Sequence, residues 1–241
     1  MELKIGCCGF ARGRATYFKR FSLVEIQQTF YKPPQLATVQ RWRAEAPADF
    51  EFTLKAWQLI THEPSSPTYR KARLKLDAPL DHYGAFRPTS EVLAAWDRIC
   101  EIARALDARI VVLQCPASFT PTEEHIRNLS TFLSTIDRRG LMLAWEPRGD
   151  WPPELVRELC EAHRLIHVVD PFQGLPVTAG TAYFRLHGRT GYRYRYTDED
   201  LRRLVTWCQD FQVVYCLFNN VSMWDDALRL LEYVGGSTTR P

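Results

Sequence analysis

The sequence lacks any apolar run long enough to cross a membrane. Its apolar stretches, such as Ile110 to Leu113, are far shorter than the roughly 20 residues that a membrane-spanning helix needs. The beginning, Met1-Glu2-Leu3-Lys4, also has no apolar segment typical of a secretory signal. We therefore expect a cytoplasmic protein with no membrane partner.

Disulfide and zinc spacings are absent as well. The chain has seven cysteines, an odd number, with no CxxC pair and no Cys/His pattern typical of zinc. Most should be free thiols. Four of them lie within apolar patterns, as expected for small core residues: Cys115, Cys160, Cys208 and Cys216. The vicinal pair Cys7-Cys8 follows the first apolar segment, so a redox or metal role stays open for it.

Charge of one sign is not in large excess. The chain has 31 basic and 28 acidic residues, for a formal net charge of +3, which does not by itself indicate a polyanion partner. Basic residues are nevertheless clustered in residues 12–20, 70–75 and 185–195. The distribution of charge is therefore more informative than its sum.

What the sequence does contain is a series of short segments rich in branched and aromatic residues, which predict β-strands. Helical patterns lie between most of them. Eight strands alternating with helices predict an α/β fold, a TIM-like (β/α)8 barrel, as a single domain over residues 1–241. The predicted strands are Leu3–Cys7, Leu23–Gln27, Glu51–Lys55, Arg109–Gln114, Leu141–Glu146, Ile166–Asp170, Ala182–His187 and Val213–Phe218.

Capping residues mark several helix starts. Thr89 and Thr197 each precede acidic residues and an apolar stripe, as N-caps do. The run Pro121-Thr122-Glu123-Glu124 opens another helix, which we expect to end at Gly140, because glycine is a common helix terminator. Further helices are expected after Pro152 and over residues 225–233.

Two stretches interrupt the ideal alternation. Residues 171–181 hold two prolines and two glycines, so the sixth crossover should have little helix and the barrel should be somewhat irregular. Residues 64–88 predict an elaborated loop, and loops of this length above a barrel often cover a site.

Polar or ionisable residues stand where the apolar segments stop. Because the carboxyl ends of the strands in a closed barrel share one face, such residues are expected to meet around one pocket. They are Glu25, Lys55, Gln114, Glu146, Asp170, His187 and Asn219.

These residue types suit acid–base chemistry on an anion. Glu146 or Glu25 is the candidate general base, with His187 or His62 as the acid partner. Arg148, Arg185 and Lys55 would clamp the charge of the substrate. An internal ion pair between Glu146 and Arg148 remains a structural alternative. The other expected substrate-binding residues are Tyr31, Gln114, Asp170, Asn219 and Asn220.

The segment 187–196 places glycines beside arginines that alternate with tyrosines. Glycine amides can approach an oxyanion, guanidinium groups bind phosphate, and aromatic faces stack on bases or sugars. We favour anion binding here and count Gly188 and Tyr196 as substrate-binding residues. The alternative is a solvated hairpin with its tyrosines packed beneath it.

The cofactor stays open. A divalent cation would suit carboxylates and an imidazole at one barrel face, and its ligands would be Glu25, Glu146, Asp170 and His187. No local metal motif such as HExxH is present.

Seven pieces of sequence in a fixed order carry a family resemblance. They are Gly6-Cys7-Cys8-Gly9-Phe10, Val24-Glu25-Ile26 with Thr29-Phe30-Tyr31, Lys55 with Ile60-Thr61-His62, Leu113-Gln114-Cys115-Pro116 with Ser118-Phe119, Glu146 with Arg148 and Trp151, Arg185-Leu186-His187-Gly188, and Phe218-Asn219-Asn220. Along nearly its whole length the chain resembles the YecE-like family, domain of unknown function family seventy-two. The resemblance implies a TIM-like barrel with these residues around one pocket, and it supplies no established activity.

The chain also departs from the family pattern. The family usually has Thr-Ser at Cys7-Cys8, tryptophan at Phe10 and Glu-Ile-Asn-Ser at residues 25–28. It usually has a histidine at Gly149, so this chain would be altered in activity if that histidine were catalytic.

Three functions follow as hypotheses. The first is an enzyme of hydrolase or isomerase type that binds a small anionic substrate bearing phosphate or carboxylate. The second is a nucleic-acid-binding protein or a metal-dependent phosphodiesterase like barrel-fold repair endonucleases, for which the basic clusters argue. The third is a non-catalytic ligand-binding protein.

Overall fold

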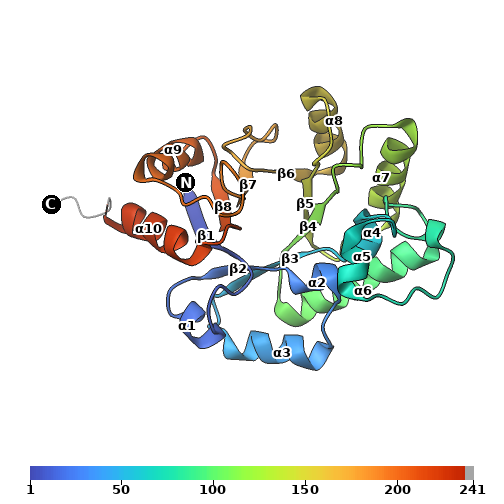
Figure 1. Ribbon diagram of the computed structural model, residues 1–241, viewed down its shortest axis with the longest axis horizontal. Coiled ribbons are helices and arrows are strands. Elements are labelled where there is room, and N and C mark those ends of the chain that lie inside the picture. The colour runs from blue at the N-terminus through green and yellow to red at the C-terminus, as the bar shows by residue number, and fades with distance from the viewer. Residues whose placement is uncertain (237–241) are drawn as a thin grey trace. The chain divides into compact units, whose positions relative to one another are not determined.

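Eight parallel strands form a closed barrel in which the strand order follows the chain (Figure 1). The computed structural model describes residues 1–236. The strands are β1 (Glu2–Cys8), β2 (Leu23–Ile26), β3 (Glu51–Lys55), β4 (Ile110–Gln114), β5 (Met142–Glu146), β6 (Leu165–Val169), β7 (Thr181–Leu186) and β8 (Val213–Phe218). The predicted (β/α)8 barrel is confirmed, and no strand end differs by more than one residue from its prediction.

Helices connect most of these strands. They are α1 (Arg14–Phe18), α2 (Gln28–Tyr31), α3 (Leu36–Glu45), α4 (Gln58–Thr61), α5 (Pro67–Ala72), the 3₁₀ turn η1 (Leu80–His82), α6 (Ser90–Leu106), α7 (Glu123–Thr135), α8 (Pro153–His163), α9 (Asp198–Cys208) and α10 (Met223–Gly236). Residues 170–180, all of them described, contain no helix, so the weak sixth crossover is confirmed. Within residues 1–236, no helix is both long enough and apolar enough to traverse a lipid bilayer.

The threonine caps are confirmed. The side chains of Thr89, Thr122 and Thr197 accept backbone N–H bonds at the starts of α6, α7 and α9. The expected end of α7 at Gly140 is wrong. The helix ends at Thr135, because Ile136 already has an extended backbone, and Gly140 instead adopts φ +83° in the following turn. That turn needs a left-handed residue, which explains the glycine without a helix end.

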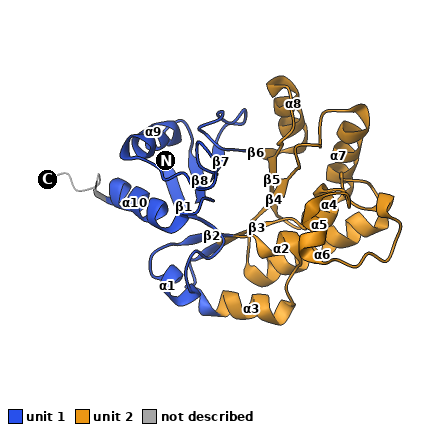
Figure 2. Cartoon of the chain, viewed as in Figure 1, with its two compact units in different colours: residues 1–25, 45–51, 167–241 blue, residues 26–44, 52–166 orange. Residues whose placement is uncertain are grey.

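The contacts divide the chain into two compact units, shown in Figure 2. Unit 1 comprises Met1–Glu25, Glu45–Glu51 and the described residues from His167 onward, and unit 2 comprises Ile26–Ala44 and Phe52–Ile166. The single-domain prediction stays a prediction.

All seven cysteines are buried free thiols, which confirms the core placement of Cys115, Cys160, Cys208 and Cys216. Burial raises the pKa of Cys7 to about 12 and also raises that of Cys8. Both thiols are therefore protonated near neutral pH, where a reactive cysteine would need a thiolate.

Candidate functional site

In unit 2, three polar side chains end three successive strands. Lys55, Gln114 and Glu146 are the last residues of β3, β4 and β5, and their exposed fractions are only 7%, 9% and 6%. Lys55 pairs with Val112, and Gln114 pairs with Glu146. Because side chains two residues apart on a strand share a face, this register places all three side chains on the same face of the sheet. The prediction that these residues end their strands is confirmed.

The Lys55 ammonium lies against the ring of Phe30, one of the residues that carry the family resemblance. Its Nζ atom is 3.6 Å from the centroid of the Phe30 ring, and the His62 imidazole packs edge-on against the same ring with centroids 4.8 Å apart. A cation over a ring face is stabilised by the negative charge of that face. Phe30 therefore positions both Lys55 and His62.

His62 is buried and surrounded by positive charge. Burial lowers its pKa to about 3, and the charges of Lys55 and Arg148 lower it in the same direction. The Thr61 hydroxyl lies 2.8 Å from the imidazole Nδ1. At neutral pH His62 is therefore an uncharged imidazole beside two cations.

The backbone around His62 is fixed by the long loop that follows it. The Tyr69 hydroxyl donates to the His62 carbonyl at 2.8 Å, and the amides of Gly84 and Phe86 donate to α4 carbonyls, each at 2.8 Å. Gly84 has φ +77°, and a Cβ atom on it would lie 2.0 Å from the His62 carbonyl oxygen. Only glycine allows this close approach. Contacts from residues 63–86 therefore fix the backbone of α4 and His62. The elaborated loop predicted over residues 64–88 is thus confirmed, with α5 and η1 inside it.

Arg148 is held at the same end of unit 2 by an ion pair. Its Nε donates to a Glu146 oxygen at 2.8 Å, and its side chain keeps an exposed fraction of 38%. The ion pair weighed as the structural alternative is therefore present. Since Arg148 also lowers the pKa of His62, it contributes to the positive field there.

Gly149, the next residue, lies close against the backbone of residues 117–119. A Cβ atom there would lie 2.7 Å from the Phe119 carbonyl oxygen and 3.1 Å from that of Ala117. A histidine, which the family resemblance places at this position, does not fit beside this backbone. Gly149 is thus required by the path of residues 117–119 in this chain.

In unit 1, the buried carboxylate of Glu25 forms the centre of a second cluster. It accepts a hydrogen bond from the Tyr183 hydroxyl at 2.8 Å and one from the Arg185 guanidinium at 3.0 Å. Cys8 pairs with Glu25 in register, so its side chain points to the same face. Burying an ion pair such as Glu25–Arg185 costs desolvation free energy. Removing either partner would leave the other as an unpaired buried charge, so the two residues depend on each other. Tyr183 could have been found from the sequence, because it precedes Arg185 by two residues and so shares its face.

Asp170, His187 and Asn219 lie together at the ends of β6, β7 and β8. One Asp170 oxygen accepts from the His187 amide at 3.0 Å and the other from the Phe172 amide at 3.1 Å. The Asn219 Nδ2 lies 3.2 Å from His187 Nδ1. Asp170 therefore braces the backbone around His187, while Asn219 orients its ring.

Residues 187–196, the segment rich in arginine and tyrosine, are held in place by hydrogen bonds within unit 1. The Gly188 amide donates to the Tyr196 hydroxyl oxygen at 2.8 Å, and Tyr196 is buried. Arg189 and Tyr194 both bind Asp200, at 2.9 and 2.6 Å. The alternative of tyrosines packed beneath the segment thus holds for Tyr196, whereas Tyr192 is 56% exposed. Anion binding by Gly188 and Tyr196 stays a prediction.

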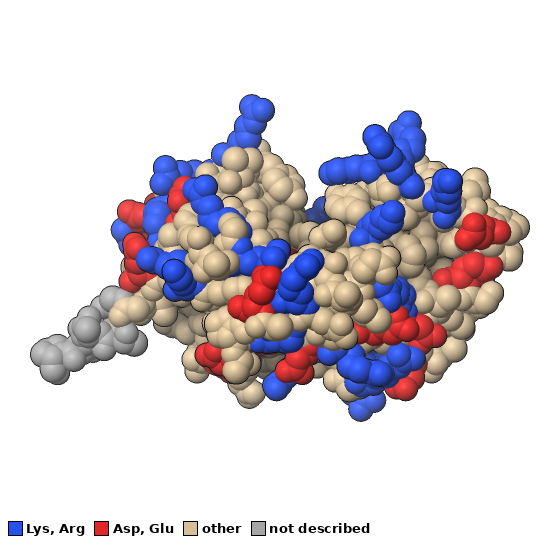
Figure 3. All heavy atoms as spheres, turned by 90° about the horizontal axis from the view of Figure 1, so that it is seen from below, with Lys and Arg blue, Asp and Glu red and all other residues tan. Residues whose placement is uncertain are grey.

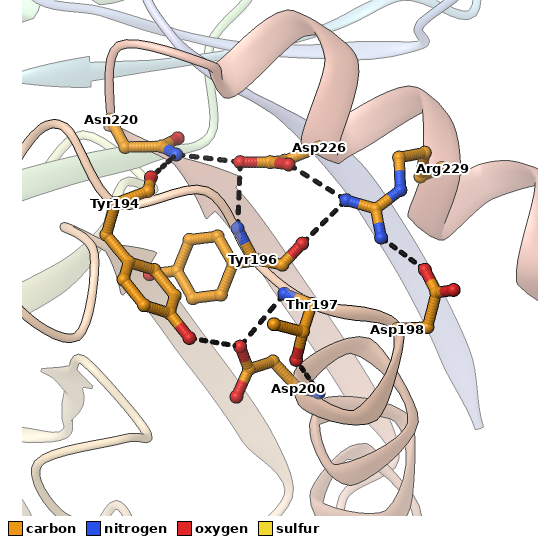
Figure 4. Close-up of polar contacts among 8 residues, drawn as sticks. All are labelled: Tyr194, Tyr196, Thr197, Asp198, Asp200, Asn220, Asp226 and Arg229. Carbon is orange, nitrogen blue, oxygen red and sulfur yellow. Dashed lines mark hydrogen bonds and ion pairs between the residues drawn. The ribbon is translucent and has the colours of Figure 1, made fainter.

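Figure 4 shows how this segment is joined to α9 and α10. The Asn220 side chain points toward both the Tyr194 carbonyl and the buried Asp226, each at 2.7 Å. Arg229 lies between Asp226 and Asp198 and also donates to the Tyr196 carbonyl at 2.6 Å. Burial raises the pKa of Asp226. Asn220 therefore anchors the loop, and its role in substrate binding stays a prediction. No sequence signal marked Asp226.

Basic side chains are widely distributed on the surface. Figure 3 shows lysine and arginine side chains over one face of the molecule, with aspartate and glutamate side chains among them. Several arginines have acidic partners, including Arg14 with Glu45 and Arg87 with Glu63. This mixture of charges does not favour the nucleic-acid hypothesis over the others.

The described residues contain no group of three or more His, Cys, Asp or Glu side chains that could hold a metal ion. The metal set Glu25, Glu146, Asp170 and His187 therefore gains no support. Lys55, Glu146 and Arg148 belong to unit 2, whereas Glu25, Asp170 and His187 belong to unit 1. That these two groups meet around one pocket stays a prediction.

A closed barrel of eight parallel strands with polar side chains at its strand ends defines a TIM-barrel protein. The family model described as protein of unknown function DUF72 matches residues 11–240, and the chain belongs to this family. The predicted family membership is thereby confirmed.

Solved structures agree with this assignment. A DUF72 family protein from Enterococcus faecalis V583 is 18% identical with a TM-score of 0.73, covering 98% of each chain. Another, from Thermotoga maritima MSB8, is 20% identical with a TM-score of 0.70, covering 98% of this chain and 100% of that one. D-psicose 3-epimerase is 11% identical with a TM-score of 0.56, covering 97% and 98%. These structural likenesses show the fold alone. No curated protein matches the sequence.

Proposed function

We propose that this protein is an enzyme that acts on a small anionic substrate bearing phosphate or carboxylate. The observation that carries the proposal is the set Lys55, His62, Glu146 and Arg148 in unit 2: two cations, a neutral imidazole and a carboxylate at the ends of neighbouring elements. We call these four residues the cationic set.

The two cations would bind the charge of the substrate. Lys55 is nearly buried and seated on Phe30, so its position is already restricted and little side-chain freedom would be lost on binding. Arg148 is partly exposed, where a solute can reach it, and its guanidinium suits the planar oxygens of phosphate or carboxylate.

Proton transfer would fall to His62 and Glu146. An imidazole whose pKa is held near 3 by burial and by positive neighbours is a weak base before substrate binds. An anion bound beside Lys55 and Arg148 would offset their charge and raise the pKa of His62, so the group would become a better proton acceptor when substrate is present. Glu146 would then handle the second proton of the reaction.

The choice between hydrolysis and isomerisation stays open. Both need an acid and a base on either side of a bound substrate. D-psicose 3-epimerase, whose name denotes sugar epimerisation, shares the barrel, and this likeness adds no residue of the site.

Calorimetric titration of the full chain with inorganic phosphate and with acetate tests the proposal. We expect measurable binding that weakens about tenfold or more in Lys55→Met, since a buried charge contact contributes about 1.5–3 kcal/mol. Lys75→Gln, which removes an exposed cation from the same unit, is the matched control and should bind as the parent does.

Absence of binding to any small anion would contradict the proposal. Binding of oligonucleotides that falls steeply with added salt, without binding of phosphate, would favour the nucleic-acid alternative. Once a substrate is found, Glu146→Gln separates the remaining alternative, because unchanged turnover in this variant would contradict the role given to Glu146.

A further inference from the structure

Two neighbouring aromatic rings, each with a cation over it, form a line that leads away from the cationic set within unit 2. Lys55 Nζ lies 3.6 Å from the Phe30 ring centroid, the Phe30 and Tyr31 ring centroids are 5.0 Å apart, and Lys71 Nζ lies 4.8 Å from the Tyr31 centroid. Each ammonium thus has its own ring, and the two rings touch edge to face. The second cation was not singled out by the sequence analysis as part of the site.

The position of Lys71 is set by the way α5 is built. Ser66 caps this short helix and Pro67 begins it, which fixes the direction of its first turn. Tyr69, which is buried, ties the helix to the carbonyl of His62 at 2.8 Å. The same helix therefore holds Lys71 over Tyr31 and touches the residue proposed to transfer protons.

Tyr31 is fixed as well. The Gln58 side chain, fully buried at the start of α4, donates to the Tyr31 carbonyl at 3.2 Å. The rings of Phe30 and Tyr31 follow one another in α2, directly after β2. Both ends of the line are thus attached to elements that also carry the cationic set.

Lys71 differs from the other basic residues in its segment. Within residues 1–236 it has no carboxylate partner among the ion pairs, and its side chain is exposed. Arg70, Arg73 and Lys75 are exposed too, yet none of these three lies over a ring within the described part of the chain. Lys71 is thus an exposed cation held over a ring, on a helix that contacts His62 of the cationic set. Such a cation is suited to bind a second negative charge.

We infer that the substrate carries two anionic groups, one bound by the cationic set and the other by Lys71 over Tyr31. The inference rests on the proposed function and narrows its substrate class to elongated molecules with charges at both ends, such as bisphosphates. The part of the molecule between the charges would pass beside the partly exposed Tyr31 ring.

Calorimetry with a graded set of anions tests the inference on the full chain. The probes are inorganic phosphate, pyrophosphate and alkanediol bisphosphates of increasing spacer length. Pyrophosphate carries a high charge without the span, so it controls for charge alone. We expect affinity to rise with spacer length to a maximum about five- to tenfold tighter than that for pyrophosphate, because only a longer spacer reaches Lys71.

Two matched variants assign the effect to Lys71. Lys71→Gln should remove the advantage of the long bisphosphates and leave the affinity for inorganic phosphate unchanged. Lys75→Gln removes an equal charge nearby and should keep the advantage. Lys71→Arg should restore it, because arginine also stacks on aromatic rings.

The outcomes separate the two proposals. If phosphate binds in a Lys55-dependent way but long bisphosphates bind no tighter than pyrophosphate, the second subsite is wrong and the proposed function stands. An equal loss in Lys71→Gln and Lys75→Gln would also overturn the subsite, since it would show a general charge effect. If none of the probes binds, the proposed function is wrong and the inference falls with it.

Discussion

The chemistry of single residues here depends on which charges burial brings together. His62 and Glu25 are both buried ionisable groups, and their surroundings differ. His62 has cations around it and stays neutral, whereas Glu25 has a guanidinium and a phenol as hydrogen-bond donors. Under the proposed function, the first group would gain a proton more readily once an anion is bound, whereas the second is held in a buried ion pair.

His62 should make the fold sensitive to acid. Its pKa is about 3 in the folded chain and about 6.5 in an unfolded one, so the unfolded chain binds the proton more readily. This contribution to the free energy of unfolding is complete above about pH 6.5 and is lost as pH falls toward about 3, by up to about 1.4 kcal/mol per pH unit. Urea unfolding at several pH values should show a shallower acid loss in His62→Gln.

His82 provides the control for this experiment. Its side chain is 43% exposed, and its hydrogen bond to Glu91 raises its pKa, which is the opposite direction. His82→Gln should therefore keep the acid loss of the parent protein. If His62→Gln and the parent lose stability identically between about pH 6.5 and pH 4, His62 is not the neutral buried group described above.

The buried pair in unit 1 predicts a strong asymmetry between single and double variants. Arg185→Met removes the positive charge paired with the buried Glu25 carboxylate while its Tyr183 hydrogen bond remains, and it should cost about 3–5 kcal/mol of unfolding free energy. Adding Glu25→Gln removes the stranded charge and should recover part of that loss. Denaturant titration measures both, and a double variant as unstable as the sum of the singles would contradict the coupling.

At the scale of elements, the sequence predicts most where the signal is local. Strand ends were found because apolar runs stop at a polar residue, as at Lys55 and Glu146, and helix starts because threonine caps act on their own first turn. The end of α7 was missed because a glycine in a turn looks the same as a glycine that ends a helix. The family resemblance includes Phe30, but its contact with Lys55 could not be predicted, because nothing local links residues on different elements.

The capping box of α9 offers a test at this scale. Thr197 accepts from the Asp200 amide at 3.1 Å, and Asp200 accepts from the Thr197 amide at 2.9 Å. Thr197→Ala should cost about 1 kcal/mol of unfolding free energy. Asp200→Asn should cost more, because Asp200 also binds Arg189 and Tyr194. Thermal or urea unfolding compares them, and an equal cost would show that the additional partners of Asp200 add nothing.

At the scale of the whole molecule, the fold follows from the number and order of the strands, and both can be predicted from the sequence. The division of the contacts into two units cannot be predicted in this way. A barrel whose strands close in chain order shares its hydrogen bonds around the ring. We therefore expect a single cooperative unfolding transition, seen alike by tryptophan fluorescence and circular dichroism. Two separate transitions would contradict the single-domain prediction.

The crowding at Gly149 bears on how members of this family can diverge. A histidine cannot be restored here by one substitution, because its first side-chain carbon would meet the Phe119 carbonyl. A relative with a histidine at this position, as the family resemblance implies, must therefore have a different local backbone course where this chain has residues 117–119. The side chain at residue 149 and the backbone of residues 117–119 thus form one steric unit, so that a side chain can be added at the first only if the second moves.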